Sequence, residues 1–145
     1  MTDRRLLRKK FSQIVKWEIK SGNFWANQWT RGQVFLKQAR KQGDKMIGYA
    51  SGRACTIKPP CKITFTRIAP RPLDDDNLAT GFKHVRDAFC AAITGTPANK
   101  IGQADGHGDI TFEYKQERGK KKTYAFRVDV EAFAPKNAET QTQKS

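Results

Sequence analysis

The sequence of 145 residues is poor in cysteine and has no long hydrophobic run. Its three cysteines (Cys55, Cys61 and Cys90) form no Cys-x-x-Cys pair, which argues against a disulfide framework and a zinc ribbon. We expect ordinary thiols in a reducing compartment. No apolar stretch approaches the roughly 20 residues that span a bilayer, and the basic N-terminus lacks the apolar region of a secretory signal. These absences predict a soluble, cytoplasmic protein without a membrane partner.

Acidic side chains are scarce in the first half of the chain. Residues 1–71 hold 17 of the 28 Lys and Arg residues but 3 of the 14 Asp and Glu residues, so the net charge of +14 belongs to this half. A field of this size attracts polyphosphates or anionic membranes. Nucleic acid is the favoured partner, because the basic residues lack the apolar companion stretch of a membrane-surface helix.

What the chain does have is enough apolar material for a core, since hydrophobic residues make up 37% of it. Wholesale disorder is therefore excluded. We find no internal repeat and no linker. The sequence predicts one domain over residues 1–135, of which 1–61 are strongly basic, followed by a flexible polar tail over 136–145.

The first half of the chain gives weak secondary-structure signals. Residues 4–20 are predicted as a helix that ends at Gly22, because apolar residues recur there at helical spacing. Residues 23–32 resemble a loop or short turn, and residues 33–41 fit a helix or a strand. Residues 46–57 are predicted as a pair of strands that turns at Ser51-Gly52.

The second half gives stronger signals. Residues 62–68 alternate and are rich in β-branched side chains, which predicts a strand. Residues 75–93 are predicted as a helix, because one stripe recurs at spacings of four and three. The members of this stripe are Leu78, Phe82, Val85, Phe89 and Ala92. Two further strands, 109–116 and 123–133, are predicted to form a hairpin that turns over residues 117–122. This order predicts an α+β fold, with a mixed or antiparallel sheet covered by helices.

Three adjacent carboxylates, Asp74, Asp75 and Asp76, stand between the predicted strand and the predicted helix. They repel one another unless a cation or the helix N-terminus offsets their charge. One interpretation is helix capping by Asp75 or Asp76, which needs a single carboxylate. The other is that Asp74 and Asp76 point to the same side and hold Mg²⁺, which prefers oxygen ligands. The spacing alone leaves both open.

Further acidic residues, Asp105 and Asp109, lie in a glycine-rich loop before a predicted strand. One of them would complete a metal site of the kind that phosphodiester hydrolysis requires, in which the metal activates water and neutralises the scissile phosphate. Lys83 and Asp87 are four residues apart, on the helix side opposite the apolar stripe. They are either a surface ion pair or a lysine directed at the phosphate.

Together, these segments resemble the RusA family of Holliday junction resolvases, which are phage and prophage endonucleases. The resemblance rests on Pro72-Leu-Asp-Asp-Asp-Asn-Leu78, on Lys83-His-Val-Arg-Asp-Ala-Phe89 and on Ala104-Asp105-Gly106. It covers residues 62–133. Ala104 stands where the family pattern has the first aspartate of a pair, and Lys83 lies three residues further along than in the pattern.

The resemblance implies a RusA-like fold and a homodimer that cleaves branched DNA with Mg²⁺, for which Mn²⁺ can substitute. It assigns Asp74, Asp76 and Asp105 to the metal and Lys83 to the developing charge on the phosphate. It also implies a phage or prophage protein acting in the host cytoplasm, in recombination, repair or phage DNA processing. The basic half would contact DNA phosphates. The candidate contacts are Arg4, Arg5, Arg8, Lys9, Lys10, Arg67, Arg71, Lys120, Lys121 and Lys122.

The main alternative is a non-catalytic nucleic-acid-binding protein whose aspartates only cap a helix. A family member that binds junctions without cutting them is another, which the alanine at position 104 permits. A structural protein of the ribosomal type fits the charge but gives the carboxylate cluster no purpose.

Overall fold

The computed structural model describes residues 6–26, 31–97 and 110–133. Its centre is a four-stranded mixed sheet in the order β1-β4-β2-β3. The strands are β1 (Leu6–Val15), β2 (Cys61–Ala69), β3 (Ile110–Arg118) and β4 (Ala125–Phe133). Strand β4 is antiparallel to both β1 and β2, whereas β3 is parallel to β2. The predicted α+β class is confirmed.

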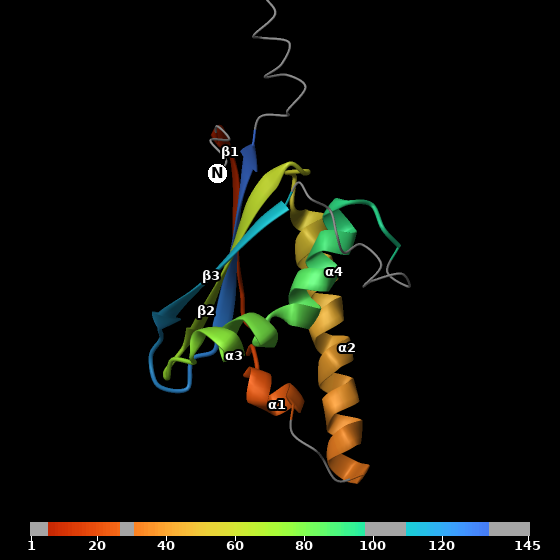
Figure 1. The fold of residues 1–145 in the computed structure, drawn as a ribbon, viewed down its shortest axis with the longest axis vertical. Coiled ribbons are helices and arrows are strands. Elements are labelled where there is room, and N and C mark those ends of the chain that lie inside the picture. Colours follow the sequence, from red (N-terminus) through yellow and green to blue (C-terminus); the bar gives the residue numbers. More distant parts are fainter. Residues whose placement is uncertain (1–5, 27–30, 98–109, 134–145) are drawn as a thin grey trace, which may run out of the picture.

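The helices are α1 (Gly22–Ala26), α2 (Arg31–Ala54), α3 (Asp75–Gly81) and α4 (Lys83–Ile93). Helices α2, α3 and α4 lie on one face of the sheet (Figure 1). Because parallel strands need a crossover connection, α3 and α4 carry the chain from β2 to β3. The opposite face of the sheet is polar and includes the Lys62–Glu113 and Arg127–Asp129 ion pairs, at 3.3 and 3.2 Å.

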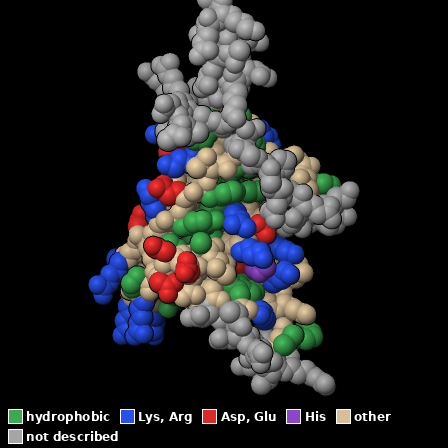
Figure 2. All heavy atoms as spheres, viewed as in Figure 1, with side chains coloured by type: hydrophobic (Ala, Val, Ile, Leu, Met, Phe, Trp, Pro, Cys, Tyr) green, Lys and Arg blue, Asp and Glu red, His purple; other side chains and the backbone are tan. Residues whose placement is uncertain are grey.

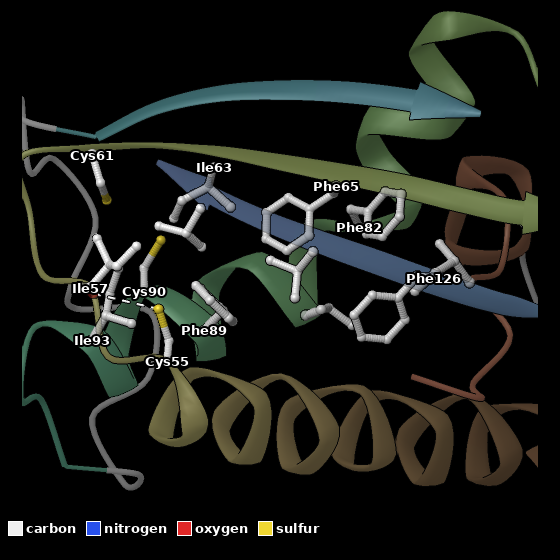
Figure 3. Close-up of a cluster of buried hydrophobic side chains, with 14 of the residues drawn as sticks. Cys55, Ile57, Cys61, Ile63, Phe65, Phe82, Phe89, Cys90, Ile93 and Phe126 are labelled. Atoms are coloured by element: carbon white, nitrogen blue, oxygen red, sulfur yellow. Dashed lines mark hydrogen bonds between the residues drawn. The ribbon is translucent and has the colours of Figure 1, made fainter. Parts of the chain in front are cut away.

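The hydrophobic core fills the space between the sheet and these helices (Figure 3). Phe65 of β2 stacks on Phe82 with ring centroids 5.2 Å apart and meets the edge of Phe89 at 5.9 Å. The predicted apolar stripe of residues 75–93 is buried throughout, which confirms this helical segment. The structure differs from the prediction in one respect: the helix is interrupted at Phe82, which separates α3 from α4. The three cysteines are free and buried.

The helix predicted over residues 4–20 is wrong, because this segment forms strand β1. Phe11 and Val15 pack against the core, and Gln13 between them accepts a 2.6 Å hydrogen bond from the Ser51 hydroxyl. Ile14 points the other way and is 62% exposed. Because the inward-facing Gln13 is polar and the outward-facing Ile14 is apolar, the sequence does not show the alternation of polar and apolar residues that is typical of a strand. Gly22, expected to end a helix, begins the short helix α1 instead.

The strand pair predicted over residues 46–57 is also wrong, since α2 continues to Ala54 and includes residues 33–41. Gly48 and Gly52 belong to the face of α2 that packs on α4. A Cβ atom at Gly48 would lie 2.4 Å from the Val85 carbonyl oxygen, and one at Gly52 would lie 2.7 Å from that of Phe89. The glycines that suggested a turn therefore allow two helices to approach closely.

The predicted hairpin between the last two strands does not form. Strands β3 and β4 exist near their expected bounds, but β2 lies between them in the sheet. The connection passes the end of β2, where the Gly119 N–H donates to the Ala69 carbonyl at 2.9 Å. Among the described helices, none is long and apolar enough to cross a membrane.

Candidate functional site

The three adjacent aspartates lie at the junction of β2 and α3, and all three are exposed. Figure 2 shows acidic side chains gathered over the start of α3. Pro70 and Pro72 follow β2 and stop the ladder, because proline has no N–H to donate. The chain then turns into α3, whose first residues are Asp75 and Asp76. The sequence therefore places a concentrated negative charge on a short surface segment.

Asp74 is the N-cap of α3. Its Oδ1 accepts from the Asn77 main-chain N–H at 2.9 Å, and its Oδ2 accepts from the Asn77 side-chain amide at 3.1 Å. Such a cap satisfies a helix N–H that has no partner within the helix. The capping interpretation is thus correct in kind, although the sequence assigned it to Asp75 or Asp76. Capping accounts for Asp74 and gives Asp76 no role.

Two partly buried contacts hold the segment that leads to these aspartates. The Gln116 side-chain amide accepts from the Leu73 N–H and donates to the Leu73 carbonyl, both at 2.7 Å. The Arg67 guanidinium donates to the Arg71 carbonyl at 2.7 Å and to the Ile19 carbonyl at 3.3 Å. The end of β2 thus fixes the main chain between the two prolines, and the end of β3 fixes it directly after them.

A cavity of about 360 Å³ opens beside this segment, between the ends of β2 and β3. Its walls include the exposed side chains of Arg71 and Arg118. Two cations near three carboxylates give this end of the molecule both charges that phosphodiester chemistry uses. The remaining lining residues are Arg67, Ala69, Pro70, Pro72, Gln116 and Glu117.

The rest of the predicted metal set falls outside the described residues. Asp105, together with Ala104 and Asp109, belongs to the undescribed segment 98–109. Within the ranges that the structure does describe, no group of three or more His, Cys, Asp and Glu side chains could hold a metal ion. The described contribution to such a site is therefore the aspartate segment alone.

Lys83 is exposed at the first residue of α4. Asp87, predicted on the side of the helix opposite the apolar stripe, is only 9% exposed, so it is not half of a surface ion pair with Lys83. Its Oδ1 accepts from Arg86 at 3.3 and 3.1 Å, and Arg86 also donates to the Tyr114 hydroxyl at 3.3 Å. Asp87 therefore anchors α4 to β3 through Arg86, while Lys83 faces solvent.

The predicted DNA contacts divide into three groups. Six are exposed: Lys9, Lys10, Arg71, Lys120, Lys121 and Lys122. Arg67 is buried, and its bonds to two carbonyls make it a support for the chain rather than a surface contact. The structure does not describe Arg4 and Arg5, nor the side chain of Arg8.

Sequence reasoning missed a second basic cluster. Lys37, Lys41 and Lys45 follow one another at intervals of four on α2, and we call them the α2 lysine ridge. Residues four apart lie on the same side of a helix, so recognising α2 as a helix would have revealed the ridge. The segment's glycines concealed it.

The ridge faces the start of α4, where His84 is partly buried against Trp25 with ring centroids 4.7 Å apart. Burial, and then the charges of Lys41, Lys83, Lys45 and Lys37, lower the pKa of His84 to about 4. Figure 2 shows Lys and Arg side chains around the histidine on the face that carries the acidic cluster.

Comparison with known proteins adds no relative, since no protein-family model and no curated protein sequence matches this chain.

Proposed function

We propose that this protein is a Mg²⁺-dependent, structure-selective endonuclease that cleaves branched DNA such as Holliday junctions. The observation that carries the proposal is the exposed segment Asp74–Asp76, held by side-chain contacts to its main chain in a chain of net charge +14. Uncompensated carboxylates are unfavourable in a DNA-binding protein unless a cation bridges them to the phosphates. The resemblance to the RusA family supports the same assignment.

The described residues fit a hard divalent cation. Mg²⁺ is held through one or two carboxylates and keeps several waters, which suits an exposed site. Each Asp74 oxygen accepts one hydrogen bond and keeps a second lone pair, and Asp76 is exposed. Asp74 and Asp76, with Asp105, would hold the ion. When bound, the metal supplies an activated water and neutralises charge on the scissile phosphate.

The chain's own residues orient the substrate. The Gln116–Leu73 pair fixes the main chain before Asp74 and the cap fixes the Asp74 carboxylate, so this carboxylate need not reorganise when a phosphate arrives. Lys83 follows α3 and carries its ammonium on the surface, where it can stabilise charge that develops on the phosphate.

A homodimer suits the substrate, because a four-way junction has near two-fold symmetry and a two-fold dimer presents two equivalent sites. Phosphate contacts select the shape of the DNA rather than its sequence. A phage or prophage protein acting on DNA in the host cytoplasm is the matching biological setting, in recombination, repair or phage DNA processing.

A second candidate function is nucleic-acid binding without cleavage. The observation that favours it is the Asp74 cap, which gives one carboxylate a structural role. In that case the double variant Asp74→Asn/Asp76→Asn would bind DNA as well as the native protein or slightly more tightly. Asparagine is as good an N-cap as aspartate, so the double variant keeps the cap.

The deciding experiment compares a labelled four-way junction with linear duplex of the same sequence, in Mg²⁺, in Mn²⁺ and in EDTA. We expect paired symmetric nicks in the junction only, and only with metal. Asp76→Asn should lower the rate by at least about 100-fold, since even outer-shell changes at metal sites have effects of 10- to 100-fold.

The matched control is Asp75→Asn, which removes the same charge from the same helical turn. We expect it to retain most of the activity, because the family resemblance assigns Asp74 and Asp76, and not Asp75, to the metal. Junction binding without nicks in either metal would reject the nuclease and support the second candidate function.

A further inference from the structure

The α2 lysine ridge is a line of positive charge with no acidic neighbour on its helix surface. The single acidic residue of α2, Asp44, is fully buried. Its Oδ1 accepts from the Trp17 indole N–H at 2.7 Å and pairs with Arg40 at 3.5 Å. Asp44 is therefore occupied inside the protein, and the ridge keeps its charge.

The ridge lies on a fixed scaffold. Along α2, the line through Lys41 and Lys45 continues into Gly48 and Gly52, whose close contacts with α4 set the spacing of the two helices. At the start of α2, the Lys37 ammonium donates to the Trp25 carbonyl, and Trp25 packs on His84. Because these contacts already order the helix pair, a ligand would not have to order it on binding.

Two further features raise the positive potential beside the ridge. Lys83 is exposed where α4 begins, and the N-terminus of an 11-residue helix adds partial positive charge. His84 bears no charge at neutral pH, so it adds an uncharged donor or acceptor between the lysines. Like charges this close repel one another and destabilise the free protein, and a bound polyanion would relieve the repulsion.

The ridge has the dimensions of a phosphate-backbone contact. Four residues of helix rise about 6 Å, so the three lysines extend over about 12 Å. One strand of a duplex places a phosphate every 3.4 Å along its axis, and three or four phosphates therefore fit along the ridge. Figure 2 shows Lys and Arg side chains beside the histidine on the face that carries the acidic cluster. Helix α3 separates the aspartates from Lys83 by roughly 12 Å.

A membrane surface is the rival ligand for a basic helix, and α2 does expose apolar side chains. The exposed large ones are Phe35, Leu36 and Met46, at 77%, 66% and 71%, and Val34 at 41%. At 100° per residue Phe35, Leu36 and Met46 point about 90° or more away from the ridge, whereas Val34 lies on the line of the ridge about one turn before Lys37. They do not form the continuous apolar face that lies beside the lysines of a membrane-surface helix.

We infer that the α2 lysine ridge, with Lys83 at its edge, is a binding surface for the phosphate backbone of DNA. This inference deepens the proposed function and rests on it for the choice of DNA. It differs from the sequence-based contact set, which contained no residue of α2. The DNA strand would pass from the ridge over the start of α4 toward the aspartate segment.

The test measures binding of fluorescent four-way junction and linear duplex in EDTA, at several salt concentrations, with the full-length protein. Lys41→Gln/Lys45→Gln should weaken binding of both DNAs about ten-fold and lower the slope of log K against log salt by about 2, one for each phosphate contact. Neither residue holds a metal or makes a hydrogen bond that fixes α1. The variant should therefore fold with an unchanged or slightly higher Tm.

The matched control is Arg53→Gln/Lys58→Gln, which removes the same charge at the other end of α2 from two exposed side chains. We expect less than about a two-fold change, because these residues lie beyond the ridge. Equal losses in the two double variants would overturn the inference, since net charge alone would then explain binding. Unchanged binding by the Lys41/Lys45 variant would overturn it as well.

Two further measurements separate the possible outcomes. Junction DNA should shift the His84 imidazole NMR signals and raise its pKa as phosphates neutralise the neighbouring lysines. Vesicles containing phosphatidylserine should compete poorly, and preferential binding to them that depends on the ridge would replace DNA with a membrane. A protein that binds DNA through the ridge but never cuts it would reject the nuclease and leave this inference standing.

Discussion

The side-chain amide of Gln116 pairs with both main-chain polar groups of Leu73, at 2.7 Å each. Gln116 is near the end of β3, and Leu73 precedes Asp74. The glutamine amide thus gives Leu73, in the loop between β2 and α3, the two hydrogen bonds that a neighbouring strand would otherwise give it. Since 43 residues separate the two partners in the sequence, this contact links the aspartates to an edge of the sheet that the chain reaches much later.

The Gln116–Leu73 pair predicts a specific defect. Gln116→Ala should lower the free energy of unfolding by about 1–3 kcal/mol, because it leaves the N–H and carbonyl of Leu73 without partners. Gln116→Glu keeps the acceptor and loses the donor, so its loss should be smaller. Urea unfolding measures both. If the two variants are equally stable, the amide does not bind the loop as described.

The structure predicts that the buried Arg67 and the exposed Arg71 differ in their contribution to stability. Arg67→Met keeps the length of the side chain but leaves the Ile19 and Arg71 carbonyls unbonded, so it should destabilise the fold by about 2–3 kcal/mol. Arg71→Gln removes an exposed charge and should leave stability within about 0.5 kcal/mol. Chemical denaturation of the two variants checks this, and the reverse order would show that Arg67 is a surface cation.

The close contact of Gly48 with α4 predicts that alanine is less stable than glycine at this position, the opposite of their helix propensities. In an exposed helix, glycine to alanine gains about 1 kcal/mol. Gly48→Ala should instead lose about 1–3 kcal/mol, because the new methyl group meets the Val85 main chain. Ala50→Gly, on the exposed side of α2, should lose about 1 kcal/mol through propensity alone. Thermal unfolding of both distinguishes the two causes. A stabilised Gly48→Ala would contradict the close packing of α2 on α4.

The burial of the Asp44 carboxyl predicts that the stability of the protein depends on pH. Burial raises the pKa of this carboxyl from 3.8 to about 6, despite the Trp17 hydrogen bond and the charge of Arg40. The folded protein therefore holds this proton more tightly than the unfolded chain. Stability therefore rises as the pH falls through 6. Above that pH the buried carboxyl is ionised, and the full free-energy cost of its burial as a charged group is present. Between pH 7 and pH 5 the gain is about 1 kcal/mol.

Asp44→Asn isolates this contribution, because other groups titrate in both proteins. His84 has the opposite sign: its folded pKa lies below the usual 6.5, so it removes stability as the pH falls from 6.5 toward 4. His84 titrates in both proteins, so its contribution cancels when the unfolding free energy of Asp44→Asn is subtracted from that of the native protein. Urea titrations at pH 7 and pH 5 give the difference, and a value independent of pH would place Asp44 in contact with solvent.

The parts of the fold that sequence reasoning predicted are those with a local signal. Strand β2 alternates and is rich in β-branched residues, and α3 and α4 share an uninterrupted apolar stripe. The parts that it missed depend on distant partners. Gly48 is compatible with a helix because Val85 lies against it, and Gln13 is accepted in β1 because Ser51 bonds to it.

The connection between β3 and β4 shows a further limit. Residues 119–124 have the length of a hairpin, yet six residues also bridge the roughly 10 Å between strands that flank a third. Only the pairing of β4 with β2 distinguishes the two. At the candidate site, the aspartates and Lys83 are visible in the sequence. Gln116, Arg67 and the α2 lysine ridge are not, because their roles come from tertiary neighbours.

The position of β4 between β1 and β2 also constrains how the protein is made. Val15 pairs with Phe126 and Cys61 with Ala132, so the contact order of the sheet is high and folding should be slow. During synthesis, β1 and β2 leave the ribosome before the strand that joins them. At 5–20 residues per second, this interval lasts on the order of several seconds for β2 and longer for β1. The nascent chain exposes unpaired edges of β1 and β2 throughout that time, and it can complete its sheet only after β4 has left the ribosome.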